Sequence, residues 1–240
     1  MNKSIKLLLP ILLISGAAHA EDLVTTPESL WKASAELGYV ATSGNTNTQT
    51  LNAKAMASNE REKWRHKVEV SALNASDKEV TTAEKYTFTG QSDYKLEKPN
   101  YLFGNIAYEN DRFSGYEYRV SESIGYGRRV IDNTGLNLDL EIGPGARQSK
   151  LDDGTTQNEA MARAAARLNW AVSETSAFEE YILIESGEDV TVTKSVTSLS
   201  SQINGSLSMK VTYTYKYTSE VPVGIDDTDT ETAITLVYNF

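Results

Sequence analysis

The sequence has no cysteine among its 240 residues, so disulfide bridges and thiolate metal sites are excluded. It is also poor in basic residues, with 23 Lys and Arg against 33 Asp and Glu and a formal net charge of −10. A chain this acidic lacks the basic face that binding to nucleic-acid phosphates requires. We therefore expect no nucleic-acid partner, and we expect packing and backbone pairing to hold the fold together.

Long hydrophobic runs are missing beyond the N-terminus, where no segment approaches 18 consecutive apolar residues, and the mean hydropathy is −0.41. This absence excludes a helical membrane protein. A membrane β-barrel stays possible, because its strands alternate between lipid and lumen and only half of each strand is apolar.

The first twenty residues have the features of a signal peptide. Lys3 and Lys6 precede an apolar run over residues 7–18, and Ala18 and Ala20 are the small residues that a signal peptidase recognises. The run is shorter than the ~20 residues of a spanning helix. Cleavage after Ala20 removes two lysines and leaves 21 basic and 33 acidic residues, a net charge of −12. We predict a signal peptide over residues 1–20, a periplasmic N-terminal segment over 21–30 and one outer-membrane β-barrel over 31–240.

The chain that remains alternates apolar and polar residues with a period of two almost throughout. Residues 136–143 read Leu-Asn-Leu-Asp-Leu-Glu-Ile-Gly, and similar alternation recurs over 85–96 and 210–217. In a strand, this pattern puts the two sets of side chains on opposite faces. The Ala-rich stretch 160–166 could form a helix, but its alternate alanines share one strand face opposite charged residues. We therefore predict a strand there as well.

Turn signals divide the chain into segments of similar length. Eleven connections imply twelve antiparallel strands in an up-and-down meander, an even number that leaves both termini in the periplasm. The predicted connections are residues 42–47, 59–64, 76–82, 97–100, 113–117, 132–135, 150–156, 173–176, 187–190, 204–206 and 219–227. None of them has the length expected of a loop that folds inward as a plug.

Aromatic residues sort by strand end under this assignment. Two belts of aromatic rings are typical of a barrel that contacts lipid, because an amphipathic ring prefers the lipid–water boundary. The periplasmic belt contains Trp31, Trp64, Tyr94, Trp170, Phe178, Tyr238 and Phe240, and the opposite belt contains Tyr39, Tyr86, Tyr108, Tyr118, Tyr215 and Tyr217.

The C-terminal residues form an apolar strand face that ends in an aromatic residue, with Ile234, Leu236, Tyr238 and Phe240 alternating. This pattern is typical of the terminal strand that the barrel-insertion machinery reads. We expect outer-membrane lipid and lipopolysaccharide, together with the export and insertion machinery, to be the partners of a monomeric barrel.

Glu122 does not fit the alternation of apolar and polar residues, because it shares the lipid face of its strand with Val120 and Ile124. A register shift near Glu122 would remove the conflict, and so would a membrane boundary closer to the outer rim.

Several motifs resemble the YdiY-like family of salt-induced outer-membrane proteins, whose domain has no known function. They span the chain beyond the signal peptide and imply an outer-membrane barrel, but the resemblance implies no catalytic residues. The motifs are Gly38-Tyr39, Ser43-Gly44-Asn45-Thr46, Glu109-Asn110-Asp111-Arg112-Phe113, Gly125-Tyr126-Gly127-Arg128, Gly143-Pro144-Gly145-Ala146-Arg147 and Leu236-Val237-Tyr238-Asn239-Phe240.

Residues that could support catalysis are few. After cleavage the only histidine is His66, which we place just inside the periplasmic end of the third strand. A base that acts on outer-leaflet lipid or on peptide is needed at the other rim. We therefore predict no enzyme activity, no catalytic residue and no cofactor. The acidic loop residues 152–153 and 226–231 lack the ligand spacing of a calcium loop, so we assign no metal.

The lumen face is predicted to be rich in charges of both signs, which would pair with one another and leave a very narrow or largely filled interior. The predicted lumen charges are Lys32, Glu36, Lys54, Lys67, Glu69, Lys85, Asp93, Lys95, Glu109, Asp111, Arg119, Arg129, Asp139, Glu141, Arg163, Arg167, Lys210 and Lys216. The leading hypothesis is a structural or envelope-adaptation protein, or a narrow channel for small solutes or ions. An outer-membrane enzyme acting on lipid or peptide and a soluble periplasmic ligand-binding barrel are the alternatives.

Overall fold

The computed structural model describes residues 31–42 and 48–240. The predicted signal peptide, the segment 21–30 and most of the first predicted turn, 43–47, lie outside these residues. The described chain forms twelve strands: β1 (Trp31–Thr42), β2 (Thr48–Glu60), β3 (Trp64–Asp77), β4 (Val80–Lys95), β5 (Asn100–Asp111), β6 (Tyr116–Asn133), β7 (Leu136–Leu151), β8 (Thr156–Ala171), β9 (Ser176–Gly187), β10 (Thr191–Gln202), β11 (Leu207–Thr218) and β12 (Thr228–Asn239). Within these residues no helix is long or apolar enough to cross a membrane.

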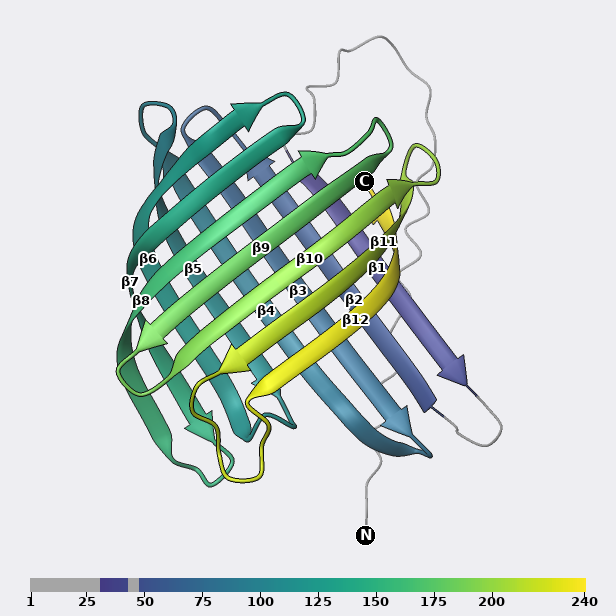
Figure 1. Ribbon diagram of the computed structural model, residues 1–240, viewed down its shortest axis with the longest axis vertical. Coiled ribbons are helices and arrows are strands. Elements are labelled where there is room, and N and C mark those ends of the chain that lie inside the picture. The colour runs from purple at the N-terminus through teal and green to yellow at the C-terminus, as the bar shows by residue number, and fades with distance from the viewer. Residues whose placement is uncertain (1–30, 43–47) are drawn as a thin grey trace, which may run out of the picture.

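Each strand pairs with its sequence neighbour, and β1 pairs with β12 to close the barrel (Figure 1). The closing register runs from Ser34 opposite Asn239 to Leu37 opposite Leu236, and every pairing is antiparallel. The predicted twelve-stranded meander is therefore confirmed, including a strand, β8, over the Ala-rich stretch. We call the end where β1 begins and β12 finishes the terminal end, and the opposite end, which carries residues 219–227, the loop end.

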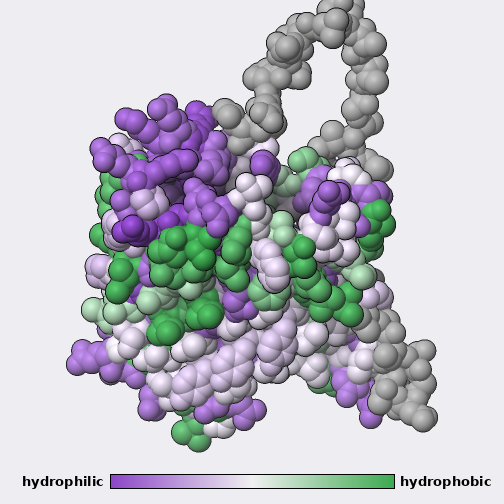
Figure 2. All heavy atoms as spheres, turned by 45° about the horizontal axis from the view of Figure 1, so that its top comes forward, coloured by the Kyte–Doolittle hydropathy of each residue, from purple (hydrophilic) through white to green (hydrophobic). Residues whose placement is uncertain are grey.

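The outer wall of the barrel is apolar at mid-height. Alternate residues face outward, so Ile124 and Ile142 are 68% and 65% exposed, while their chain neighbours Ser123 and Glu141 are buried on the inner side. Figure 2 shows a belt of hydrophobic residues across the barrel with hydrophilic residues at its end. This distribution is typical of a wall that contacts hydrocarbon rather than water.

Both aromatic belts are confirmed, and neighbouring rings in them touch. At the terminal end, Trp64 meets Tyr94 with ring centroids 5.1 Å apart, and Trp170 meets Phe178 at 6.5 Å. Nearer the loop end, Tyr108 stacks on Tyr118 at 6.3 Å. These contacts join adjacent strands on the outer face.

Glu122 stays on the outer wall, so the hypothesis of a register shift at this residue is wrong. The bulges of β6 lie at Tyr116–Tyr118 and Arg129–Ile131, on either side of an uninterrupted register. Glu122 is exposed and lies opposite outward-facing Ile106. A second carboxylate faces outward on β9, where Glu180 accepts hydrogen bonds from Ser195 at 2.7 Å and from Thr197 at 2.5 Å.

The position of Glu122 makes a prediction about stability. Replacing Glu122 with Leu removes a carboxylate from the apolar wall, and we expect the free energy of unfolding to rise by about 1 kcal/mol. Urea unfolding of the barrel in phospholipid vesicles measures the change. Glu220→Leu, in the loop 219–227, is the control and should give no gain. An unchanged or lower stability of Glu122→Leu would contradict the placement of this side chain in lipid.

Candidate functional site: the lumen

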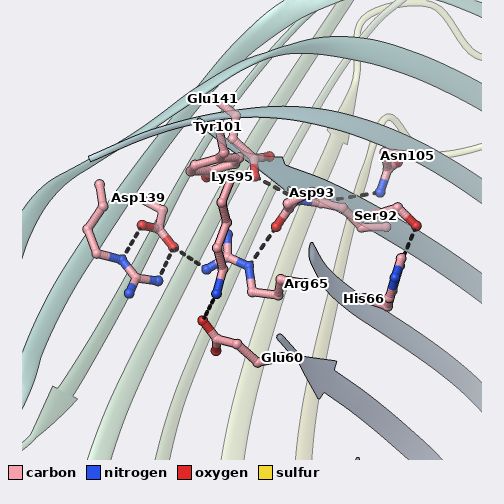
Figure 3. Close-up of polar contacts among 12 residues, drawn as sticks. Glu60, Arg65, His66, Ser92, Asp93, Lys95, Tyr101, Asn105, Asp139 and Glu141 are labelled. Carbon is pink, nitrogen blue, oxygen red and sulfur yellow. Dashed lines mark hydrogen bonds and ion pairs between the residues drawn. The ribbon is translucent and has the colours of Figure 1, made fainter. Parts of the chain in front are cut away.

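Charged side chains inside the barrel form a network at the terminal end, which we call the terminal-end network (Figure 3). Arg65 donates to Asp93 at 2.6 Å and lies 3.5 Å from Asp139. Arg129 donates to Asp139 through Nε at 2.8 Å and through a terminal nitrogen at 3.0 Å. This series of ion pairs therefore links β3, β4, β6 and β7 across the interior, because each carboxylate accepts from at least one guanidinium group.

Glu141 extends this network toward β8. Its oxygens accept from Gln91 at 2.8 Å, from the Tyr101 hydroxyl at 3.1 Å and from Arg163 at 2.8 Å. The Arg163 side chain is only 1% exposed. The pairing offsets the cost of burying both charges, which would be several kcal/mol for either charge alone.

Two glycines of β6 make room for the aromatic rings of the network. A Cβ atom on Gly127 would lie 2.2 Å from the Tyr101 ring, and one on Gly125 would lie 2.7 Å from the Phe103 ring. Only glycine leaves enough space at this close approach. The Gly125-Tyr126-Gly127 motif thus alternates two inward gaps with one outward ring.

Four aromatic rings point into the lumen, each beneath an arginine. The guanidinium carbons of Arg65 and Arg163 lie 5.0 and 4.8 Å from the ring centroids of Tyr101 and Phe103. Arg119 covers Tyr116 at 4.1 Å, and Arg167 covers Tyr181 at 5.0 Å. These cation–π contacts hold the arginine side chains against the wall.

A second cluster, the loop-end network, surrounds Arg147. One terminal nitrogen of Arg147 donates to Glu159 and to the carbonyl of Val190, both at 3.0 Å, and the other donates to Glu185 at 3.3 Å. Glu159 in turn accepts from the backbone N–H groups of Asp189 and Val190. The network therefore fastens the β9–β10 connection to the inner wall.

The loop 219–227 reaches across the loop-end opening, but none of its residues lines the interior of the barrel. A Cβ atom on Gly115 would lie 2.8 Å from Pro222 and 3.1 Å from Ile225, which places the β11–β12 loop against the β5–β6 loop. Four strands separate these two hairpins in either direction around the barrel. The loop must therefore cross the opening to make the contact, and we call it the mouth loop.

Between the networks and the mouth loop lies a cavity of about 330 Å³, the lumen cavity, to whose lining every strand except β7 contributes. The exception follows from packing, because the inward charges of β7 are engaged in the two networks. The cavity is lined by eight basic side chains, namely Lys54, Lys67, Lys85, Arg119, Arg167, Lys194, Lys210 and Lys216. Seven glutamates contribute to the lining, and the carboxylate of Glu180 is bound on the outer face. The other six point inward, namely Glu36, Glu69, Glu109, Glu179, Glu185 and Glu231.

Ion pairs line the cavity in two groups. Toward the terminal end, Lys54 lies 2.9 Å from Glu69, and Lys210 lies 3.1 Å from Glu36. Toward the loop end, Glu109 accepts from Lys216 at 2.5 Å and lies 3.6 Å from Lys85. Hydroxyl groups of Ser71, Thr87, Thr212 and Thr214 are among the uncharged groups that complete the lining.

Every charged residue predicted for the lumen, except Lys32, takes part in these contacts. Arg119 and Arg167 do so through an aromatic ring, and Lys95 donates to Glu60 at 2.7 Å. The lumen also contains charged residues that were not among those predicted from the sequence, namely Arg147, Glu159, Glu179, Glu185, Lys194 and Glu231. In β9 both faces carry a glutamate, so alternation alone could not decide which one points inward. Arg147 could have been found by extending the alternation of Asp139 and Glu141 across Gly143 and Gly145.

His66 lies near the terminal end of β3, as predicted, and on the outer face. Its Nδ1 is 2.9 Å from the Ser92 hydroxyl, and its ring stacks on Trp64 at 5.6 Å. A nucleophilic serine needs a histidine oriented by a third group. No hydrogen bond joins His66 to a carboxylate within the part of the chain that the structure describes.

The acidic loops offer no cluster of metal ligands. Among residues 31–42 and 48–240, no three His, Asp or Glu side chains are placed to hold one metal ion. Asp153 instead accepts from the backbone N–H of Thr155 at 2.7 Å, which holds the pKa of its carboxyl below the usual value. This contact closes the β7–β8 turn.

Removing the charge of Arg147 should strongly destabilise the barrel. Arg147→Met leaves Glu159 and Glu185 without their guanidinium partner, and we expect a loss of about 3–5 kcal/mol in the free energy of unfolding. Arg112→Met is the matched control, because Arg112 pairs with Glu84 at 3.0 Å but is 65% exposed. That variant should lose less than about 1 kcal/mol. Equal losses in urea unfolding would show that burial does not strengthen the Arg147 pairs.

Filling the space at Gly127 should disturb the terminal-end network. We expect Gly127→Ala to displace the Tyr101 ring and to cost about 1–3 kcal/mol of stability through overpacking. Gly205→Ala is the control, since open space surrounds Gly205. Thermal unfolding of both variants tests the prediction, which is wrong if the two melt at the same temperature.

Comparison with known proteins finds similarity in sequence to one protein and in fold to solved β-barrels. It is 29% identical over 203 residues to the uncharacterized protein YdiY of Escherichia coli (strain K12), covering 84% of this chain and 80% of that protein. The solved NanC porin superposes with a TM-score of 0.51 at 12% identity, over 86% of this chain and 98% of that chain. The COG4313 outer membrane channel from Pseudomonas putida F1 superposes with a TM-score of 0.52 at 9% identity, over 93% and 100% of the two chains.

These two solved structures share the closed antiparallel barrel with this chain. The expected resemblance to YdiY is confirmed by the match to the E. coli protein. Residues 35–240 match the protein family of unknown function DUF481, which is nearly the whole described barrel, and the chain therefore belongs to that family.

Proposed function

We propose that this protein is a narrow outer-membrane channel for small solutes or ions, with both termini in the periplasm. The observation that carries the proposal is the lumen cavity, which is lined by charges and hydroxyl groups from eleven of the twelve strands. A twelve-stranded barrel is wider than the eight-stranded barrels whose interiors side chains fill, so its open space can hold water and small ions. The apolar outer belt supports insertion in lipid and disfavours a soluble periplasmic barrel.

The mouth loop and the terminal-end network narrow the passage through the lumen at its two ends. Small ions and solutes can pass such constrictions through gaps between polar side chains, whereas a bulky substrate cannot. The same two features favour a second candidate function, a filled barrel that only stabilises the envelope. Conductance distinguishes these functions, since a filled barrel carries no current.

Recording from single barrels in planar lipid bilayers tests the proposal. We expect small, steady conductance steps in KCl, because water and ions occupy the lumen cavity. Replacing residues 220–226 with Asn-Gly should increase the conductance, since it removes the segment that crosses the opening. If neither the wild-type protein nor the variant with the shortened loop carries current, the channel proposal is overturned and the structural barrel is favoured.

A role as an enzyme acting on lipid or peptide is tested at His66. We expect His66→Ala to leave both the conductance and the turnover of outer-membrane lipid and protein unchanged, because no carboxylate orients the ring in the described structure. Ser92→Ala is the companion variant. A fall in lipid or peptide turnover in both variants would contradict the expectation and favour an enzyme.

A further inference from the structure

Lys194 lies in the middle of the inner face of β10 and lines the lumen cavity. It is directly opposite Leu183 of β9 and Lys216 of β11. Like charges in opposite positions of neighbouring strands repel each other. No carboxylate lies within 4.0 Å of the Lys194 ammonium among the residues that the structure describes.

The carboxylates near Lys194 and Lys216 are bound by groups other than Lys194. Glu109 accepts from Lys216 at 2.5 Å and lies 3.6 Å from Lys85, which Asp111 also approaches at 3.6 Å. Glu185 is bound by Arg147, which lies outside the lining of the cavity, and Glu231 accepts from Asn52 at 2.8 Å. Lys194 therefore has no ion-pair partner among the described residues, although Glu231, which is bound by the neutral Asn52, keeps its negative charge in the same lining. Eight basic side chains against six inward glutamates give the lining a positive surplus.

Arg119 adds to this charge from the opposite wall, because its guanidinium rests on the Tyr116 ring and has no carboxylate within 4.0 Å among the described residues. The surplus contrasts with the chain as a whole, whose formal net charge is −10. An ammonium group taken from bulk water needs a partner with negative charge or a hydrated space. The cavity beside Lys194 has room for such a partner, and Thr214, diagonal to Lys194 on the same face, can donate a hydrogen bond to it.

We propose that the loop-end half of the lumen binds small anions bearing a carboxylate or phosphate group, with Lys194 as a direct ligand, and that the barrel consequently prefers anions over cations. The preference rests on the proposed channel function, but the anion site itself does not. The site would select ligands by charge, since flexible ammonium groups and hydroxyl donors impose little shape on a small anion.

Two measurements on the refolded barrel test the proposal separately. The first is the reversal potential in a KCl gradient, where we expect chloride to be more permeant than potassium. Lys194→Gln should lower the permeability ratio about fivefold, the effect of one charge about 4 Å away in water. Lys78→Gln, in the exposed β3–β4 turn, makes the same change in net charge outside the lumen and should leave the ratio unchanged.

The second measurement is the melting temperature with inorganic phosphate against chloride at equal ionic strength. We expect phosphate to raise the melting temperature of the wild-type protein and of Lys78→Gln but not of Lys194→Gln, because a ligand stabilises the state it binds. Lys194→Arg should keep the shift. If the barrel carries no current but phosphate raises its melting temperature in a way that depends on Lys194, the channel proposal is overturned and the anion site is retained. A potassium-selective barrel, or a phosphate shift that survives Lys194→Gln, would overturn the anion site.

Discussion

Closure of the sheet is the constraint on which the rest of this structure depends. Pairing β1 with β12 from Ser34 to Leu37 closes the sheet, so every strand has a hydrogen-bonded neighbour on both sides. Hydrocarbon offers no hydrogen bonds, and an open edge there would cost several kcal/mol for each unpaired group. Once the sheet is closed, each side chain has only two directions, toward the outside or toward the lumen. The charged residues are thereby collected in the lumen, apart from outward-facing exceptions such as Glu122 and Glu180.

Collecting charges in a confined space forces them to pair. The terminal-end network and the loop-end network place carboxylates against guanidinium groups at 2.6–3.5 Å, and arginine is well suited to this role because its planar fork makes two hydrogen bonds at once. Lysines line the remaining cavity, where a hydrated interior can solvate an ammonium group. Arginine thus prevails in the packed part of the lumen and lysine in the open part, where Arg119 and Arg167 join six lysines.

The lumen is asymmetric as a result. Arginine–carboxylate pairs and the rings of Tyr101 and Phe103 pack the interior beside β5–β8, and the inward glycines of β6 make that packing possible. The wall formed by β10–β12 and β1–β4 carries lysines, hydroxyls and shorter side chains that leave the cavity open. Lys194 is at the border of these regions, where no described carboxylate comes near enough to neutralise it. This local imbalance is the basis for proposing an anion site in an otherwise acidic protein.

The sequence by itself determined the twelve strands, their order, the aromatic belts and most of the lumen charges, because each depends on local alternation and on turn residues. Even the conflict at Glu122 could be read from its neighbours Val120 and Ile124. Only the tertiary structure decided which charges pair, since Arg147 on β7 reaches Glu185 on β9 across the intervening strand β8. It also decided that the mouth loop crosses the opening and that Lys194 lacks a partner. Both facts depend on distances across the barrel, and alternation along a single strand carries no information about the opposite wall.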